Sequence, residues 1–504
     1  MKKITALALT LLMCITAVVP AAAIGIVPYD SYTYDFWEDI VFTPAPYIPG
    51  RSISGISLGI GPNGEPVGAF SRPEDITVGA DGLVYVADTG NNRIVVMNAE
   101  MTRAVKIINS FEIERGSGTF NTPMGVAKCL EGYLYVADMN NMRIIAIDVD
   151  YNGSNDRVVR IIDNPQAEHN PGAELLEEGY VFSPLKVAVD YAGRVYVTAR
   201  GVFQGIMVFN QEGEFTGFFG TISVTLSTWQ IFWRALETQA QRERRPRYVP
   251  TEFTGIDVDP NGFIYASNFD TNGVQSVRRL NPTGEDVIRR GENGNLGGDL
   301  AIRPINEYAG TSEIIDVVYR NKGIYSLLDR RRGRIFTYDR EGNLLYIFGG
   351  LGSTAGTFKE PVAIEVSGDS ILVVDAGLNE ILTFEATMYG KLINEAVGLR
   401  FDGDEALAVE KWRQVLMLNE NLEIANIGIG KAYLTAGDNV SAMHYLRLGQ
   451  SRSFYSIAYR RHRNEVLRDN MSWILSGVMV IALAIPITYK VRKRKREREG
   501  IVDE

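Results

Sequence analysis

The chain has 504 residues, with 51 basic and 61 acidic side chains, a formal net charge of −10, 3 histidines and 2 cysteines. This length leaves room for more than one domain, and the acidic balance disfavours nucleic acid as a partner. The low cysteine count excludes a disulfide framework. Only His169 falls among the sequence repeats described below, which excludes a three-histidine zinc centre there.

The first 23 residues have the features of a secretory signal peptide. Lys2 and Lys3 precede an apolar run over residues 4–19, and alanines at 21–23 provide small side chains for cleavage. We therefore expect the mature chain to begin near residue 24, outside the cytoplasm, with residues 24–50 as an N-terminal extension.

Residues 51–386 repeat one pattern six times: a strand, a turn with glycine, a second strand, a polar hairpin and a third strand. In the two clearest copies the second strand ends at Asp88 or Asp138, and an arginine follows at Arg93 or Arg143. A unit of four short strands cannot bury both faces alone, so the copies must stack around an axis. The pattern predicts an all-β six-bladed β-propeller. The equivalent residues of successive blades are Asp88, Asp138, Ala199, Asn268, Asp329 and Asp375.

The residues that carry this pattern resemble the NHL repeat. Each clear copy runs from a proline through a turn to Tyr-Val-Ala-Asp and then to Asn, Arg and Ile, as at residues 85–88 and 135–138. The third and fourth copies have lost the aspartate and the arginine. The resemblance implies the fold, but propellers of this kind bind proteins, RNA, sugars or lactones, so it implies no single function.

The sixth blade has only three strands of its own before a helical pattern begins. We expect residues 51–58, upstream of the first blade, to pair with residues 380–384 and to close the ring as its outer strand. The third strand of this blade should end on the side of the propeller that carries the turns between strands one and two. The chain should leave the propeller on that side.

The two faces of the propeller differ in their loops. Turns between strands one and two are minimal, as at residues 79–82 and 190–193, whereas the links between blades are long over residues 162–183, 221–250 and 291–312. We call the side with the long links and the strand two to three turns the decorated face, and the opposite side the plain face. Long loops on a rigid scaffold usually carry recognition, so we expect binding on the decorated face.

The link over residues 221–250 has the most unusual composition. Its apolar residues follow the spacing of an amphipathic helix, and arginines come after them. Either the tryptophans dock this helix on the propeller as a lid, or the rings form a platform for a sugar or a partner chain, with arginines binding carboxylate or phosphate. Arg331, in a strand two to three turn, should share that face. The link residues concerned are Trp229, Phe232, Trp233, Leu236, Arg242, Arg244, Arg245 and Arg247.

One residue from each inner strand should face the propeller axis. The carboxylates of Asp75 and Asp316 could hold a divalent cation, as in gluconolactonase-type propellers, but Lys186 belongs to the same ring and can neutralise them through water. We expect a solvated ion network there, with no metal and no cofactor. The recurring aspartates, such as Asp88, should accept hydrogen bonds from the backbone of their own hairpins, braced by the arginine. The six axial residues are Asp75, Gly125, Lys186, Gly255, Asp316 and Ala363.

Residues 387–470 change to the apolar period of helices. Small residues at the positions where two helices would cross recur after 34 residues, and so do the bulky residues between them. This region resembles two tetratricopeptide units and is either a connecting stalk or a docking site for another protein. The recurring positions are Ala396, Leu399, Gly403, Asp404, Ala408 and Trp412, and then Gly430, Tyr433, Gly437, Asp438, Ala442 and Leu446.

Residues 471–489 are uncharged and, as a helix, long enough to cross a bilayer. The tail at residues 490–504 carries 7 basic residues, which should keep it in the cytoplasm. Without the 2 basic residues of the leader and the 7 basic and 4 acidic residues of the tail, 42 basic and 57 acidic residues are left outside, a net charge of about −15. We expect a single-pass cell-membrane protein whose large domain is extracytoplasmic and repels anionic headgroups as well as nucleic acid.

The sequence favours a non-catalytic binding or scaffold protein, with a protein or a glycan as partner and no assigned catalytic residue. The order of signal peptide, NHL-type propeller, helical repeats and anchor resembles proteins that accompany carbohydrate import systems in Gram-positive bacteria. The resemblance implies a membrane transport complex as partner. The alternative is a metal-dependent, lactonase-like hydrolase that uses Asp75 and Asp316.

Overall fold

The computed structural model describes residues 27–113, 116–151, 156–165, 173–177, 179–220, 252–270, 275–290, 296–299 and 312–498. They form two compact units that divide between Asp402 and Gly403, and each is described by itself. The expected signal peptide at residues 1–23 and the link at residues 221–250, with its tryptophans and arginines, lie outside the described residues.

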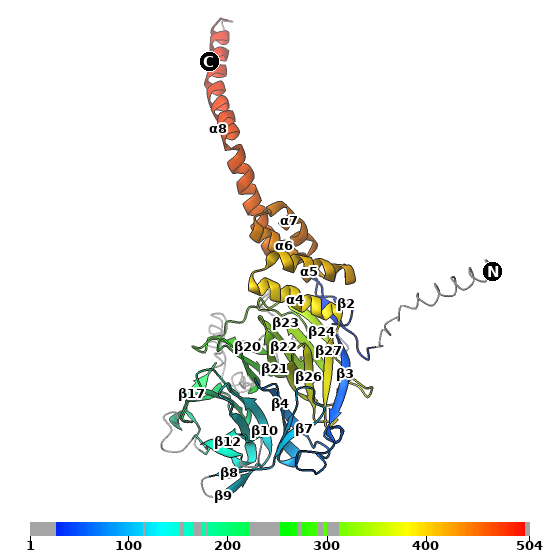
Figure 1. The fold of residues 1–504 in the computed structure, drawn as a ribbon. Helices are drawn as coiled ribbons and strands as arrows, with labels where there is room; N and C mark the ends of the chain where they lie inside the picture. Colours follow the sequence, from blue (N-terminus) through cyan, green and yellow to red (C-terminus); the bar gives the residue numbers. More distant parts are fainter. Residues whose placement is uncertain are drawn as a thin grey trace, which may run out of the picture. The chain divides into compact units, whose positions relative to one another are not determined.

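The first unit is a six-bladed β-propeller, as the repeats predicted (Figure 1). The inner strands contact one another in chain order, and the last contacts the first. Blades 1 and 2 contain β4 (Pro73–Val78), β5 (Val84–Asp88), β6 (Arg93–Met97) and β7 (Ala104–Ile108), then β10 (Pro123–Lys128), β11 (Leu134–Asp138), β12 (Arg143–Asp148) and β13 (Arg157–Ile162). Blades 3 and 4 contain β14 (Pro184–Val189), β15 (Val195–Ala199), β16 (Ile206–Phe209) and β17 (Phe215–Phe219), then β18 (Phe253–Val258), β19 (Ile264–Asn268) and β20 (Val277–Leu280). Blades 5 and 6 contain β21 (Ile314–Asn321), β22 (Ile324–Asp329), β23 (Arg334–Tyr338) and β24 (Leu344–Phe348), then β25 (Pro361–Ser367), β26 (Ser370–Asp375), β27 (Glu380–Ala386) and β3 (Tyr47–Ser54).

Blade 6 joins both ends of the propeller sequence. Strand β3 pairs antiparallel with β27, with Ser54 opposite Glu380. The expected closure is confirmed, but the closing strand lies earlier than predicted, since Ile56–Leu58 forms a 3-10 turn instead. Because β27 continues to Ala386, its partner reaches back to Tyr47.

Two hairpins that the repeats did not predict extend the sheets of two blades. Strands β1 (Tyr32–Tyr34) and β2 (Ile40–Phe42) attach to β24 of blade 5, and the hydroxyls of Tyr32 and Tyr34 both donate to the Asp299 carboxylate. Strands β8 (Ser110–Ile113) and β9 (Gly116–Thr119) extend blade 2 through β13. Both hairpins lie at the outer ends of their sheets.

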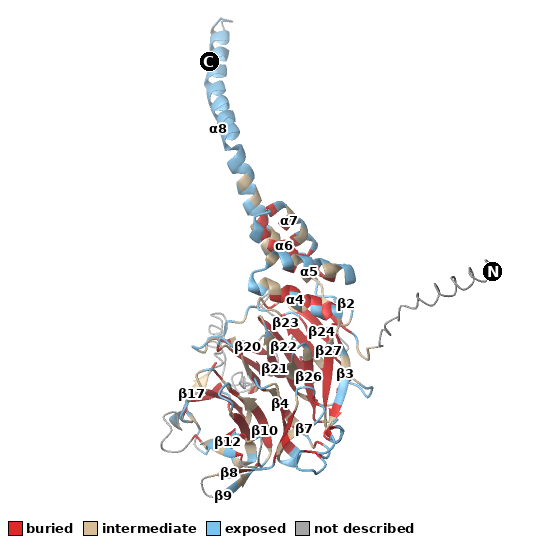
Figure 2. Ribbon diagram, in the orientation of Figure 1, coloured by how far each residue is buried: buried red, intermediate tan, exposed pale blue. Residues whose placement is uncertain are grey.

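The core of the first unit lies between neighbouring blades, where Figure 2 shows the buried residues. Every residue of β5 is buried, and its side chains alternate between two neighbours. Val84 and Val86 belong to a cluster with Leu372 of blade 6, whereas Tyr85 belongs to a cluster with Leu134 of blade 2. Each buried aliphatic side chain contributes about 1.5–3 kcal/mol, so the stacking of blades supplies the stability that a single blade lacks.

Helix α4 (Met388–Asp402) belongs to the same unit as the propeller. Its last residue, Asp402, forms an ion pair with Lys322, which lies in the turn between β21 and β22 on the plain face. A Cβ on Gly390 would lie 2.2 Å from the Pro46 carbonyl oxygen, so the helix approaches the chain too closely for a side chain there. The chain therefore leaves the propeller on the plain face, as predicted.

The second unit contains α5 (Glu405–Leu418), α6 (Glu423–Ala436), α7 (Asn439–Leu448) and α8 (Arg452–Arg498). Gly403 and Gly437 are 34 residues apart and lie just before α5 and α7. Both adopt positive φ, at 91° and 84°. Trp412 packs on Gly428, where a Cβ would lie 2.4 Å from the indole nitrogen. These features fit the expected helical pairs, and their assignment to the tetratricopeptide class stays a prediction.

Helix α8 is 47 residues long and is a candidate membrane span by its length and composition. Within the described ranges it is the one helix that meets this test. The predicted apolar stretch at residues 471–489 lies inside it. The type of membrane and the orientation of the helix stay predictions.

Candidate functional site

The inner strands bring the predicted axial charges together. Asp75 on β4, Lys186 on β14 and Asp316 on β21 come from blades 1, 3 and 5. The Lys186 ammonium donates to Asp75 Oδ1 at 2.5 Å and to Asp316 Oδ2 at 3.3 Å. We expected water to mediate this neutralisation, and that expectation was wrong: the ammonium contacts both carboxylates directly. A lysine side chain is long enough to reach two other blades from its own.

Small residues at the other axial positions make this contact possible. A Cβ on Gly255 would lie 2.4 Å from Asp316 Oδ1, and a Cβ on Gly125 would lie 2.4 Å from the Leu185 carbonyl oxygen. Neighbouring inner strands therefore approach each other at the axis too closely for side chains at these two positions. Glycine at positions 125 and 255, between the long or acidic side chains of the ring, is therefore a packing requirement.

Burial and mutual charge set the protonation of this cluster. Burial opposes the charge of Lys186, but the carboxylates of Asp316 and Asp75 outweigh it and raise the pKa of the ammonium. Burial raises the pKa of Asp316 to about 6, although Lys186 acts in the opposite direction. At neutral pH the Lys186 ammonium is therefore charged and paired with carboxylates, and Asp316 becomes protonated as the pH falls through about 6.

The axial carboxylates also join neighbouring blades through the backbone. Asp75 accepts a hydrogen bond from the Val126 N–H of blade 2 at 2.9 Å, and Asp316 accepts one from the Ile364 N–H of blade 6 at 2.9 Å. An inner strand is the edge of its sheet, so its outward N–H groups need partners from outside the blade. The carboxylates supply these partners, which makes them structural elements of the ring.

A second pair of carboxylates lies two residues further along two inner strands and was missed by the sequence analysis. Asp257 of blade 4 accepts from the Tyr319 N–H of blade 5 at 2.6 Å, and Glu365 of blade 6 accepts from the Val78 N–H of blade 1 at 3.4 Å. Burial raises the pKa of Asp257 to about 7 and that of Glu365 well above its usual range. The period of two along each inner strand could have revealed them, since residues two apart share a face.

These residues line a cavity of about 580 Å³ inside the ring. Its lining includes Leu130, Tyr191 and Pro260, which belong to strand one to two turns, so the cavity opens toward the plain face. Leu130 and Tyr191 are 78% and 64% exposed. Among the residues that the structure describes, His, Cys, Asp and Glu side chains form no group of three that could hold a metal ion.

The recurring aspartates have a structural role, though not the one predicted for blades 1 and 2. Asp138 accepts from the Asn121 N–H at 2.7 Å, from the Asn141 side chain at 2.8 Å and from Arg143 Nε at 3.0 Å. The backbone donor therefore comes from the segment before the inner strand, not from the hairpin. Asp375 in blade 6 accepts from both places. The predicted brace by the arginine is confirmed.

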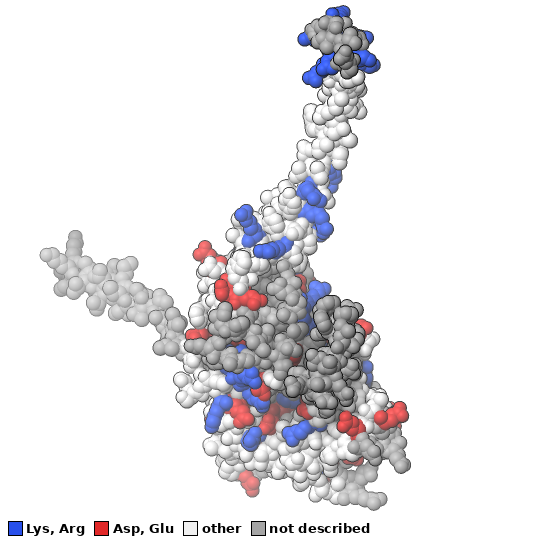
Figure 3. Space-filling model, turned by 180° about the vertical axis from the view of Figure 1, so that it is seen from behind, with Lys and Arg blue, Asp and Glu red and all other residues white. Residues whose placement is uncertain are grey.

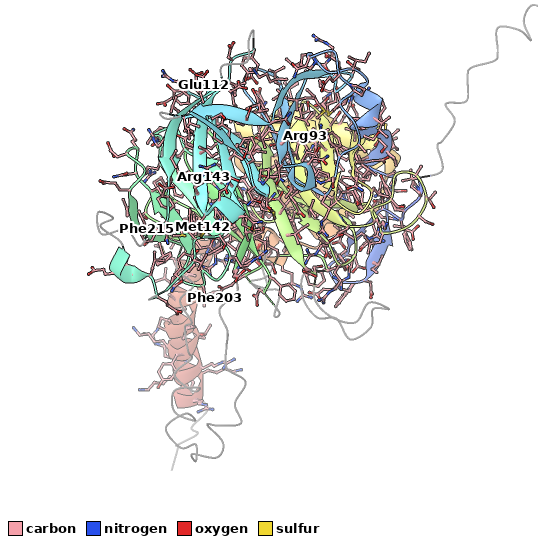
Figure 4. The ribbon with its side chains drawn as sticks, turned by 90° about the horizontal axis from the view of Figure 1, so that it is seen from below. Arg93, Glu112, Met142, Arg143, Phe203 and Phe215 are labelled. Carbon is pink, nitrogen blue, oxygen red and sulfur yellow. The ribbon has the colours of Figure 1, made fainter. Side chains whose placement is uncertain are left out.

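The decorated face carries the strand two to three turns. Met142 and Phe203 lie in two of these turns and are 45% and 38% exposed, and Figure 4 labels both together with Arg143. Arg331 lies in the corresponding turn of blade 5, 5.7 Å from the Phe269 ring. The exposed side chain of Arg331 is thus on the face predicted for it. The link residues from Trp229 to Arg245, predicted for the same face, lie outside the described residues.

The neighbours of Arg331 are structural. Arg332 is buried and donates to the Asp299 carbonyl oxygen at 2.9 Å and to the Ser312 hydroxyl at 2.5 Å. Arg330 pairs with Glu313. The run of arginines in this turn therefore includes two residues that hold the segment before the inner strand of blade 5.

Comparison with known proteins gives one family match. Residues 70–97, in blade 1, match the family model of the NHL repeat, and no curated protein sequence matches the chain. Virginiamycin B lyase from Staphylococcus aureus is 12% identical over 71% of this chain and 87% of its own, with a TM-score of 0.37. A streptogramin B lyase is 14% identical over 68% of this chain and 100% of its own, with a TM-score of 0.39. A structure described as a gluconolactonase is 13% identical over 68% and 94%, with a TM-score of 0.36.

Similarities of this size to solved structures say nothing about activity. The repeat match covers strands β4, β5 and β6 of blade 1 and ends before β7. The chain is a six-bladed β-propeller with an NHL repeat in its first blade and a candidate membrane-spanning helix near its C-terminus.

Proposed function

We propose that the protein is a non-catalytic, membrane-anchored extracytoplasmic binding protein, and that its propeller captures a protein or glycan partner. The observation that carries this proposal is the pairing of Lys186 with both Asp75 and Asp316. The two carboxylates that a lactonase would need share one ammonium and accept hydrogen bonds from neighbouring blades. Carboxylates with these partners stabilise the ring and do not take part in a reaction.

The decorated face is the surface that we assign to the partner. Helix α4 covers part of the plain face through Asp402 and Lys322. The decorated face carries the exposed apolar side chains of Met142 and Phe203. Exposed apolar groups on the same face as a charged side chain, Arg331, suit a partner that offers rings or aliphatic groups together with carboxylates. A transport complex for carbohydrates is the partner class that we favour, with the helical region as stalk or docking site.

Site-specific photocrosslinking in the native membrane tests this proposal. A crosslinker would replace Met142 or Phe203 on the decorated face, and Leu130 on the plain face would be the control, because it is also exposed. We expect a subunit of an import system, or a glycan, to be captured from the first two positions and not from Leu130. Capture from Leu130 alone would contradict the assignment of the face.

The alternative of a metal-dependent hydrolase is favoured by one observation. Asp257 and Glu365 line the cavity, and among the residues that the structure describes neither forms an ion pair with a basic side chain. A purified chain that hydrolyses lactones only with an added divalent cation, and loses this activity in the Asp316→Asn variant, would establish the hydrolase. We expect no hydrolysis and no change of Tm when a chelator is added.

A further inference from the structure

Basic side chains gather on α8 just before its apolar stretch, a feature that the proposed function does not use. Between residues 452 and 470 the helix carries Arg452, Arg460, Arg461, Arg463 and Arg468 against the acids Glu465 and Asp469. Figure 3 shows Lys and Arg side chains along this part of α8 and again beyond the apolar stretch. The rest of the predicted extracytoplasmic chain is acidic, so this segment has the opposite charge.

Most of these arginines face solvent. Arg461 donates to the Leu434 carbonyl oxygen at 3.1 Å and so holds α8 against the end of α6. Arg460 and Arg463 are exposed. Among the residues that the structure describes, Arg468 forms an ion pair with its neighbour Asp469, at 3.3 Å, and both side chains are more than 60% exposed. An exposed ion pair of this kind is weak, so the charge of Arg468 stays accessible.

The helix fixes the height of these charges above a membrane. It runs without a break from Arg452 through the apolar stretch that begins at Met471. With a rise of about 1.5 Å per residue, Arg468 lies about 4.5 Å and Arg463 about 12 Å above the start of that stretch. The headgroup layer is about 5–8 Å thick, and charges act over about 8 Å beyond it at physiological salt. Arg468 therefore lies within the headgroup layer and Arg463 within reach of its surface charge.

The tail already supplies the basic residues that would orient the helix. Seven basic side chains follow the apolar stretch, and a basic outer flank opposes the usual charge asymmetry. Trp473, at the start of the stretch and 80% exposed, is the type of residue that settles at the interface. Basic residues on the outer flank thus need a reason other than orientation.

We propose that Arg463 and Arg468, supported by Arg460, form a docking surface for the phosphate groups of anionic phospholipids in the outer leaflet. This inference rests on the membrane anchoring of the proposed function. The surface holds the base of the second unit against the bilayer and limits the tilt of α8. The acidic remainder of the chain would then be kept away from the same lipids by repulsion.

The full-length chain in lipid nanodiscs tests this inference. Nanodiscs would contain phosphatidylcholine and phosphatidylglycerol, and native mass spectrometry would measure which lipid stays bound after release. We expect wild-type protein to retain phosphatidylglycerol in preference. Each arginine removed in Arg463→Gln and Arg468→Gln should lower this preference about fivefold. Lys411→Gln with Arg413→Gln, on α5, is the control with the same loss of charge and should change nothing.

Further measurements distinguish binding of lipid phosphates from other roles of these arginines. Arg463→Lys with Arg468→Lys should keep the preference, because a charged surface needs no guanidinium geometry, and its loss would contradict the proposal. Inorganic phosphate that competes better than chloride at equal ionic strength would indicate a discrete phosphate site instead. A lower Tm of the glutamine variant in lipid-free detergent would show that the arginines pair with protein. A chain that does not enter nanodiscs would refute the membrane anchor itself.

Discussion

Lys186 of blade 3 contacts Asp75 of blade 1 across the interior of the propeller, at 2.5 Å between the ammonium and Oδ1. The contact joins residues 111 positions apart in the chain and, through Asp316, a third blade. Charges that are largely buried are stable only when they are paired. Lys186 therefore links the inner strands of three blades near the axis through its contacts with Asp75 and Asp316.

Removing this lysine should destabilise the propeller. In Lys186→Met the two carboxylates lose their counter-charge, and we expect the free energy of unfolding to fall by about 3–5 kcal/mol at neutral pH. The loss should shrink below pH 6, because Asp316, with a pKa of about 6, then becomes protonated. Chemical denaturation of the full chain would measure both values. Lys391→Met, which removes an exposed ion pair with Asp369, should cost less than about 1 kcal/mol.

Asp257 should make stability fall as pH rises. Its folded pKa of about 7 lies above the ordinary value of 3.8, so between about pH 4 and pH 7 the folded chain binds more protons than the unfolded chain. The stabilising contribution of the protonated group is present below pH 4 and is lost as the pH rises through 7. Asp257→Asn should flatten the dependence of Tm on pH in this window. An unchanged slope would show that Asp257 titrates normally.

A disulfide between the two ends of the ring should lock it. Ser54 of β3 lies opposite Glu380 of β27, so Ser54→Cys with Glu380→Cys places two thiols across one strand pair. Oxidation should raise the free energy of unfolding by about 2–5 kcal/mol, since it closes a long loop in the unfolded chain. Tm measured with and without reductant gives the effect, and each single variant is a control. Failure to oxidise in the folded state would contradict the register.

The link at residues 221–250 carries the prediction that the tryptophans dock it on the decorated face. Trp233→Ala should then speed cleavage of this link by proteases without changing the Tm of the propeller, because the ring has its own core. Burial of each indole would contribute about 2–3 kcal/mol to docking. If quenchers reach both Trp229 and Trp233 freely, the platform interpretation becomes the better one.

The local pattern of the sequence determined the blades. A period of two with a glycine turn is repeated in each blade, and a terminal aspartate follows in four of the six copies. A strand that is buried on both sides needs a nearly continuous apolar run, such as Val84 to Ala87 in β5. The same periodicity predicted that Asp75, Lys186 and Asp316 face the axis. The order of apolar and basic residues near the C-terminus likewise predicted the candidate span, because a span requires an apolar run long enough to cross the hydrocarbon core, and such a run is visible in the sequence.

Only the tertiary structure decided what these residues do together. The distance from the Lys186 ammonium to each carboxylate depends on the diameter of the ring, which no local pattern encodes. The backbone donors to Asp138 and Asp257 come from other segments or other blades, and a backbone N–H leaves no mark in the sequence. The hairpin of β1 and β2 pairs with β24 of blade 5, and its Tyr32 hydroxyl donates to Asp299, a contact across 267 residues that no local pattern indicates.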